Sequence, residues 1–115
     1  MIRAKFTENA ESKSITLTVT GHAGQAPAGQ DIICSSASIL MYTVAQMAQY
    51  MYSRHQLKKK PHIAIDGGNA SITVKPKEEH YGEALHAYFV AQVGYSLLAH
   101  NYPQYVELTM FGTAE

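Results

Sequence analysis

Residues 14–20 read SITLTVT, and this stretch predicts a β-strand at the heart of the fold. Ile15, Leu17 and Val19 point to one side of an extended chain, and threonines point to the other. Such alternation is typical of a strand that is buried on one face. The preceding MIRAKFTE alternates more weakly, and the turn residues NAES separate the two segments. We therefore expect a first hairpin from Ile2 to Thr20.

A loop and a long helix should follow this hairpin. Gly21 to Gln30 contains three glycines and a proline, which predicts a loop. Asp31 then stands where a helix N-cap is expected. The helix should run to about Arg54, since Pro61 bars any continuation. Its buried face is predicted from apolar residues at three- and four-residue steps: Ile33, Ala37, Leu40, Val44, Met47, Ala48 and Met51.

The second half of the chain also predicts a hairpin followed by a helix. HIAIDGGNASITVKP, residues 62–76, predicts two strands around a turn at Asp66 to Asn69. A helix from about Glu78 to His100 comes next, and YVELTMF closes as a strand with Val106, Leu108 and Met110 on one face. The buried face of this second helix is predicted to hold Tyr81, Leu85, Tyr88, Phe89, Val93 and Leu97.

Together these elements predict one α+β domain over residues 1–115, in the order ββαββαβ. Two helices packed on one face of a mostly antiparallel sheet is the natural arrangement for this order. The other sheet face carries many threonines, and the pattern leaves open whether it is solvated or forms a dimer interface.

The amino-acid composition limits the binding partners and the cellular compartment that we expect. Nine basic and nine acidic side chains cancel, which argues against direct nucleic acid binding. The basic run at 58–60 is typical of a solvated helix end rather than a phosphate site. A single cysteine forms no internal disulfide, and no signal peptide or bilayer-length apolar segment is apparent. We expect a cytoplasmic protein with no membrane association.

The stretch GHAGQAPAGQDIICSS, residues 21–36, carries the candidate chemistry. With Asp31 as N-cap, Cys34 would be the third helical residue, among free N–H groups at the positive end of the helix dipole. A thiolate is favoured there, and the same N–H groups suit a developing oxyanion. His22 follows the strand directly, so a loop that folds back would bring its imidazole to Cys34. Cys with His is the minimum for thiol nucleophilic catalysis.

Plainer interpretations stay open at this point. A lone cysteine in a helix is usually a small buried hydrophobic residue, and Asp31 caps a helix whatever else it does. Ser38 lies one turn beyond Cys34 and either packs or serves the site. The remaining histidines show no metal-ligand spacing with Cys, Asp or Glu, so we predict no metal and no cofactor.

At these residues the chain resembles the ribosomal-processing cysteine proteases, the Prp family. The family pattern is a Gly-His-Ala, a short loop, a Gly-x-Asp, two aliphatic residues, a Cys, small residues and a Ser. The positions that match it here are Gly21, His22, Ala23, Gly29, Asp31, Ile32, Ile33, Cys34 and Ser38.

The resemblance implies a cysteine endopeptidase. Cys34 would be the nucleophile and His22 the proton acceptor, with Asp31 and Ser38 in support. Residues of the substrate loop would be Gly21, Ala23, Gly24 and Gly29. It also implies a homodimer that removes the N-terminal extension of large-subunit ribosomal protein twenty-seven.

Two departures from the family pattern bear on substrate choice. The loop has QAP at 25–27 where many members carry an aromatic residue, and Ser35 and Ser36 replace the small alanines that often follow the cysteine. The alternatives are a non-catalytic ribosome-associated or assembly protein of the same fold, and a thiol redox sensor.

Overall fold

The computed structural model describes residues 1–21 and 28–112 of the 115-residue chain. The order of elements in these residues confirms the predicted ββαββαβ arrangement and the α+β class. The elements are β1 (Ile2–Asn9), β2 (Ser14–Thr20), α1 (Ala28–Ser53), β3 (His62–Asp66), β4 (Asn69–Val74), the short 3-10 helix η1 (Glu78–His80), α2 (Tyr81–Asn101) and β5 (Val106–Thr109).

The strand predicted from residues 14–20 lies at the centre of the sheet, whose order is β3-β4-β2-β1-β5. β2 pairs antiparallel with both β1 and β4, and β4 pairs antiparallel with β3, whereas β5 runs parallel to β1. Leu17 of β2 lies opposite Phe6 of β1 and Ile72 of β4, and all three side chains are buried. The prediction of a mostly antiparallel sheet is therefore confirmed.

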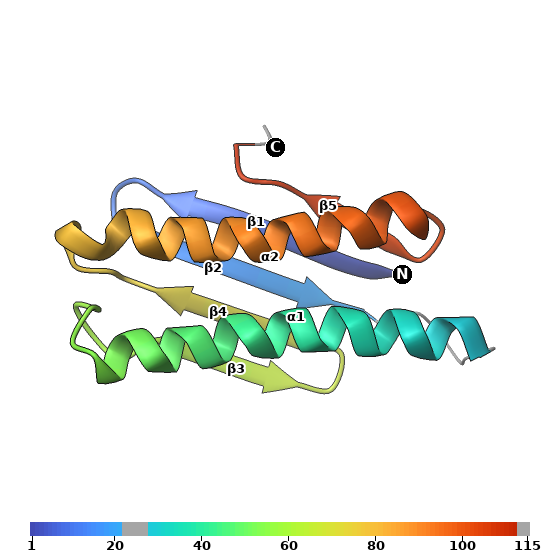
Figure 1. The fold of residues 1–115 in the computed structure, drawn as a ribbon, viewed down its shortest axis with the longest axis horizontal. Coiled ribbons are helices and arrows are strands. Elements are labelled where there is room, and N and C mark those ends of the chain that lie inside the picture. Colours follow the sequence, from blue (N-terminus) through green and yellow to red (C-terminus); the bar gives the residue numbers. More distant parts are fainter. Residues whose placement is uncertain (22–27, 113–115) are drawn as a thin grey trace.

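Both helices lie side by side across one face of the sheet, as predicted (Figure 1). Two buried tyrosines of α2 hold this layer in place, because each phenol finds a backbone acceptor. The Tyr88 hydroxyl donates to the Ile72 carbonyl oxygen at 3.0 Å, and the Tyr95 hydroxyl donates to the Ala37 carbonyl oxygen at 2.7 Å. Tyr88 thus ties α2 to β4, and Tyr95 ties α2 to α1.

The start of α1 differs from its prediction. The helix begins at Ala28, so residues 28–30 are helical and not loop, and Gly29 is its second residue. Asp31 is the fourth helical residue, and the prediction that it is the N-cap is wrong. Asp is a strong cap by local preference, but the apolar pattern does not reveal a helix that starts one turn earlier on small and polar residues.

The end of α1 agrees with its prediction to within one residue, and the structure gives the reason. His55 adopts a left-handed backbone conformation with φ of 60°. The His55 N–H donates to the Tyr52 carbonyl oxygen at 3.0 Å, and the Gln56 N–H donates to the Met51 carbonyl oxygen at 2.9 Å. These two bonds form a Schellman motif, which ends a helix by satisfying its last carbonyl groups.

The buried face of α2 was predicted wrongly for three of its six residues. Phe89, Val93 and Leu97 are 48%, 46% and 61% exposed. The side chains buried on this helix are instead Ala84, Tyr88, Ala91, Gln92 and Tyr95. Apolar residues line more than one side of α2, so periodicity alone does not say which side meets the sheet. The small side chains of Ala84 and Ala91 allow α2 to pack closely against its neighbours. The buried Gln92 is satisfied because its side-chain oxygen accepts a hydrogen bond from the Phe111 N–H at 2.8 Å.

Exposed apolar side chains gather on the helices and not on the open sheet face. We call the set Ile39, Phe89, Val90, Val93 and Leu97 the helix-layer apolar surface; each member is at least 46% exposed. The open sheet face is polar. There the Thr16 and Thr73 hydroxyls lie 2.8 Å apart, and Arg3 lies 3.7 Å from Glu107.

Two further expectations need correction. Residues Ile32–Ser53 of α1 are long and apolar enough to cross a membrane by length and composition, contrary to the expectation that no segment is. A core helix passes the same test, and α1 buries one side against the sheet and α2.

Met110 was predicted to lie on the final strand, but β5 ends at Thr109 and Met110 is 48% exposed.

Candidate active site

A pocket of about 430 Å³ opens between the first half of α1 and the tip of the β3–β4 hairpin. Figure 1 shows this hairpin tip beneath α1. The volume is in the range of about 300–1,000 Å³ that is usual for small-molecule and side-chain binding sites. The described lining residues are Ile2, Val19, Gly21, Cys34, Ala37, Ser38, Met41, Tyr42, Ile65, Asp66, Gly67, Gly68, Asn69 and Ala70.

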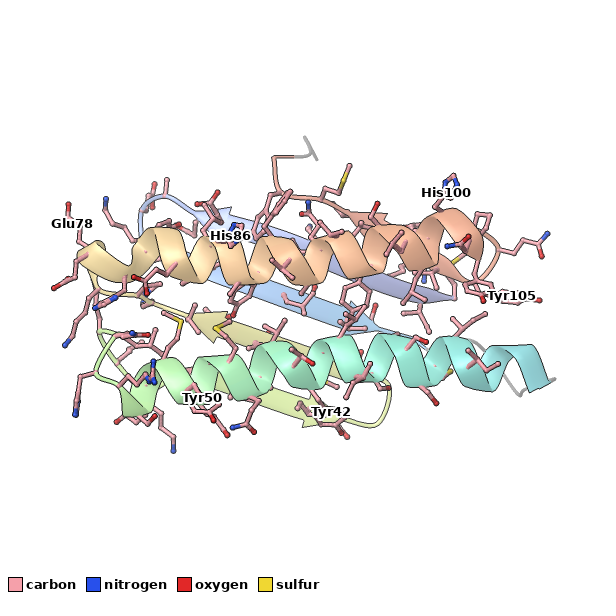
Figure 2. The ribbon with its side chains drawn as sticks, viewed as in Figure 1. Tyr42, Tyr50, Glu78, His86, His100 and Tyr105 are labelled. Atoms are coloured by element: carbon pink, nitrogen blue, oxygen red, sulfur yellow. The ribbon has the colours of Figure 1, made fainter. Side chains whose placement is uncertain are left out.

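Cys34 faces this pocket from α1. It is the chain's one cysteine, and it is half-buried, with part of its side chain packed against the core. Ser38, one turn further along α1, is exposed and also lines the pocket, as helical spacing predicted. Tyr42 follows on the same side of α1, and Figure 2 shows its side chain over the β3–β4 hairpin. The thiol thus has partial access to solvent and an apolar backing.

The helix start lies further from Cys34 than expected. Because α1 begins at Ala28, the free N–H groups of its described residues are those of 28–30. Cys34 is the seventh helical residue, and its own N–H falls within the regular helical hydrogen-bond ladder. The prediction that free first-turn N–H groups surround the Cys34 sulfur and donate to an oxyanion is therefore not supported.

Gly21 fixes the chain at the point where it leaves β2. Its φ is +90°, and its N–H donates to the Gly68 carbonyl oxygen at 2.8 Å. A Cβ at this position would clash with the Met1 carbonyl oxygen, so only glycine fits. The family resemblance placed Gly21 in the substrate loop, and the structure adds a backbone role for it at the pocket wall.

The hairpin tip is a part of the site that sequence analysis missed. DGGN, residues 66–69, was interpreted only as a turn, and residues 65–70 line the pocket. Thr20 pairs with Asn69 in the register between β2 and β4, which brings the tip beside Gly21. This pairing joins segments about fifty residues apart, and no local sequence signal reports it.

Other candidate residues lie away from the pocket or outside the residues that the structure describes. His22, Ala23 and Gly24 lie beyond the described residues, and so does the side chain of Asp31; the backbones of Gly29 and Asp31 are helical. Within residues 1–21 and 28–112, no histidine lines the pocket; His86 and His100, for example, lie on α2 (Figure 2). The same residues contain no cluster of three His, Cys, Asp or Glu side chains that would hold a metal ion.

Most of the chain matches a known protein family. The family model described as cysteine protease Prp matches residues 1–107. The chain belongs to the Prp cysteine protease family. The Prp match covers both the strand that leads to Gly21 and the helix that carries Cys34, together with the hairpin that closes the pocket. A comparison with curated proteins finds no relative of this chain.

Solved structures show the same fold. SMU.848 from Streptococcus mutans shares 22% identity with a TM-score of 0.68, over 96% of this chain and 94% of that one. Two structures of the ribosomal processing protease Prp from S. aureus share 20% identity with TM-scores of 0.66, over 96% of this chain and 99% of theirs. One of these holds a covalently linked product peptide, and the other holds a substrate peptide. At such identities the likeness is one of fold.

Proposed function

We propose that this chain is a cysteine endopeptidase in which Cys34 is the nucleophile and His22 the proton acceptor. The observation that carries the proposal is the position of Cys34, which is half-buried on the wall of a pocket that also contains Gly21. Gly21, the residue that precedes His22 in the sequence, is anchored to Gly68 in the wall of this pocket. Membership of a cysteine protease family supports the same assignment.

The chemistry follows from the two side chains. The imidazole of His22 takes the thiol proton, and the Cys34 sulfur attacks the scissile carbonyl carbon. The resulting tetrahedral intermediate collapses to a thioester as the C–N bond breaks, and His22 gives its proton to the leaving amine. Water, deprotonated by the same imidazole, then attacks the thioester, which releases the carboxylic acid and restores the thiol. No cofactor is needed for any of these steps.

We propose that the substrate is the N-terminal extension of large-subunit ribosomal protein twenty-seven. This assignment rests on the resemblance at residues 21–38 and on the family. The pocket is compatible with it, because apolar side chains such as Ile2, Met41 and Ile65 line much of the wall. An extended peptide with a bulky apolar residue at the cleaved bond would place that residue among them.

We also propose that the protein is a homodimer in the cytoplasm. The helix-layer apolar surface supports a dimer, since a group of large apolar side chains exposed on the two helices of a small domain is often covered by a partner. A second copy that uses the same surface would give a closed two-fold interface. The open sheet face is the poorer candidate because its side chains are mostly hydroxyl-bearing or charged.

Two measurements test the dyad. The first is hydrolysis of a synthetic peptide with the ribosomal extension, followed by mass spectrometry, for the native protein, Cys34→Ala and His22→Ala. We expect cleavage by the native protein alone, with Ser36→Ala as a matched control that still cleaves. Ser36 suits this purpose because its hydroxyl donates to the Ile32 carbonyl oxygen at 2.8 Å, within the helix.

The second measurement is the pH profile of Cys34 alkylation by iodoacetamide, with and without His22. A profile that His22→Ala leaves unchanged would exclude the dyad. Rapid alkylation without any peptide cleavage would instead favour the redox sensor, and a slow, His22-independent reaction would favour the non-catalytic assembly protein.

A further inference from the structure

Among the described residues that line the pocket, one carries a carboxylate. Among the described lining residues, the ionisable side chains are Cys34, Tyr42 and Asp66, and none of these lining residues is cationic. That carboxylate belongs to Asp66. Most of the other described lining residues are apolar or are glycines, so they do not offset the negative charge of Asp66.

The position of this carboxylate is defined by the hairpin. Asp66 is the last residue of β3, and its Oδ1 accepts the Gly67 N–H at 2.7 Å. This bond orients the carboxyl group at the turn while the side chain stays exposed to solvent. No ion pair between described residues engages it; the pairs found there are Arg3–Glu107 and His80–Glu83. Its negative charge is therefore available to a molecule that enters the pocket.

We propose that Asp66 determines substrate specificity, by selecting peptides that carry Lys or Arg close to the bond that Cys34 attacks. This inference rests on the proposed function, since it concerns the same pocket. A cation within a few ångströms of an exposed carboxylate is favoured modestly, and an anion there is disfavoured by a similar amount. The apolar wall accepts the uncharged part of the peptide, and Asp66 discriminates by charge.

The variant that tests this is Asp66→Asn. The Asn side-chain oxygen keeps the hydrogen bond from Gly67 and the shape of the turn, so the substitution removes only the charge. Glu107→Gln is the matched control, because it removes one carboxylate from β5, at the opposite edge of the sheet from β3. Both variants change the net charge by the same amount.

A chemical probe reads the charge at Cys34 without any need for catalysis. Two methanethiosulfonate reagents, one with a trimethylammonium group and one with a sulfonate group, each form a mixed disulfide with the thiolate and release methanesulfinate. Cys34 is the chain's one cysteine, so intact mass reports modification at that atom alone. The ratio of the two rate constants, divided by the same ratio for free cysteine, measures the local charge preference.

At low salt we expect Asp66→Asn to lower this ratio by about threefold, with Glu107→Gln leaving it as in the native protein. An unchanged ratio in Asp66→Asn would overturn the inference. The effect should weaken as salt is added, because the carboxylate is exposed.

Peptide cleavage gives the second readout. The probe is a set of synthetic peptides with one apolar core and Lys, Gln or Glu at each flanking position, cleaved in competition and counted by mass spectrometry. The native protein should prefer Lys to Gln by about threefold at one or more positions, and Asp66→Asn should lose that preference. Cleavage with the same preference in both proteins would refute the role of Asp66. Failure to cleave any peptide would count against the proposed protease function, and the reagent ratio would then decide the Asp66 inference alone.

Discussion

The Gly21 N–H donates to the Gly68 carbonyl oxygen at 2.8 Å, and this bond joins the end of β2 to the turn between β3 and β4. Both residues line the pocket that Cys34 faces. The bond therefore links the backbone just before His22 to the hairpin tip that carries Asp66. The candidate nucleophile, the residue before its proposed base and the proposed specificity residue meet at one end of the sheet.

Gly21→Ala should lower the free energy of unfolding by about 3 kcal/mol, because an alanine at φ of +90° is strained and its Cβ meets the Met1 carbonyl oxygen. Urea unfolding followed by circular dichroism measures this change. Gly67→Ala is the matched control within the same wall, since its Cβ would meet nothing within 4 Å. A loss of similar size in both variants would contradict a specific role for Gly21.

Tyr95→Phe should cost about 1–2 kcal/mol of stability, because the buried hydroxyl donates to the Ala37 carbonyl oxygen at 2.7 Å. The ring contact with Phe6, whose centroid lies 5.9 Å away, would remain. Thermal or urea unfolding checks the value against Tyr50→Phe, whose residue is 61% exposed and should be near neutral. An equal effect of the two substitutions would rule out a stabilising bond between α2 and α1.

Alkaline pH should destabilise the protein in part through Tyr81. Burial raises the pKa of its phenol from 10.0 to about 12, aided by the hydrogen bond to Glu8 at 2.7 Å and by the Glu8 charge. A raised native pKa means that folding favours the neutral phenol. This contribution to stability is full below pH 10.0 and is lost as pH rises through about 12.

The measurement is the urea midpoint as a function of pH across that window. Tyr81→Phe should reduce the fall in stability, and Glu8→Gln should reduce it by less because an amide oxygen still accepts the hydrogen bond. Burial raises the pKa of Tyr88 and Tyr95 in the same direction, so part of the fall should survive in Tyr81→Phe. A slope that Tyr81→Phe leaves as steep as before would show that this phenol is not linked to folding.

Leu97→Glu should convert the proposed homodimer to a folded monomer. Leu97 is 61% exposed, so a charge there is tolerated by the isolated fold but not at a desolvated interface. Light scattering after gel filtration gives the mass, and circular dichroism gives the folded state. Thr18→Glu, on the open sheet face, is the control. If Thr18→Glu dissociates the dimer and Leu97→Glu does not, the sheet face is the interface.

The strands were predicted well because their signal is local. Alternation in residues 14–20 and a two-glycine turn at 67–68 define a pleated face and a tight reversal whatever the rest of the chain does. The helices were predicted close to their observed positions, and the buried face of α1 was predicted correctly, whereas that of α2 was wrong for three of its six residues. For α2, apolar residues occur on two sides, and only packing against the sheet and against α1 decides that Tyr95 is buried while Phe89 and Val93 are exposed.

The candidate site divides in the same way. The sequence alone determined that a strand is followed by His22, by a glycine-rich segment and then by a long helix that carries Cys34. Spacing and residue type are properties of the chain and need no tertiary structure. Tertiary structure alone decided that the β3–β4 turn is the opposite wall of the pocket, since the pairing of Thr20 with Asn69 depends on the sheet register. It also decided that α1 begins at Ala28, which moves the free N–H groups one turn away from Cys34.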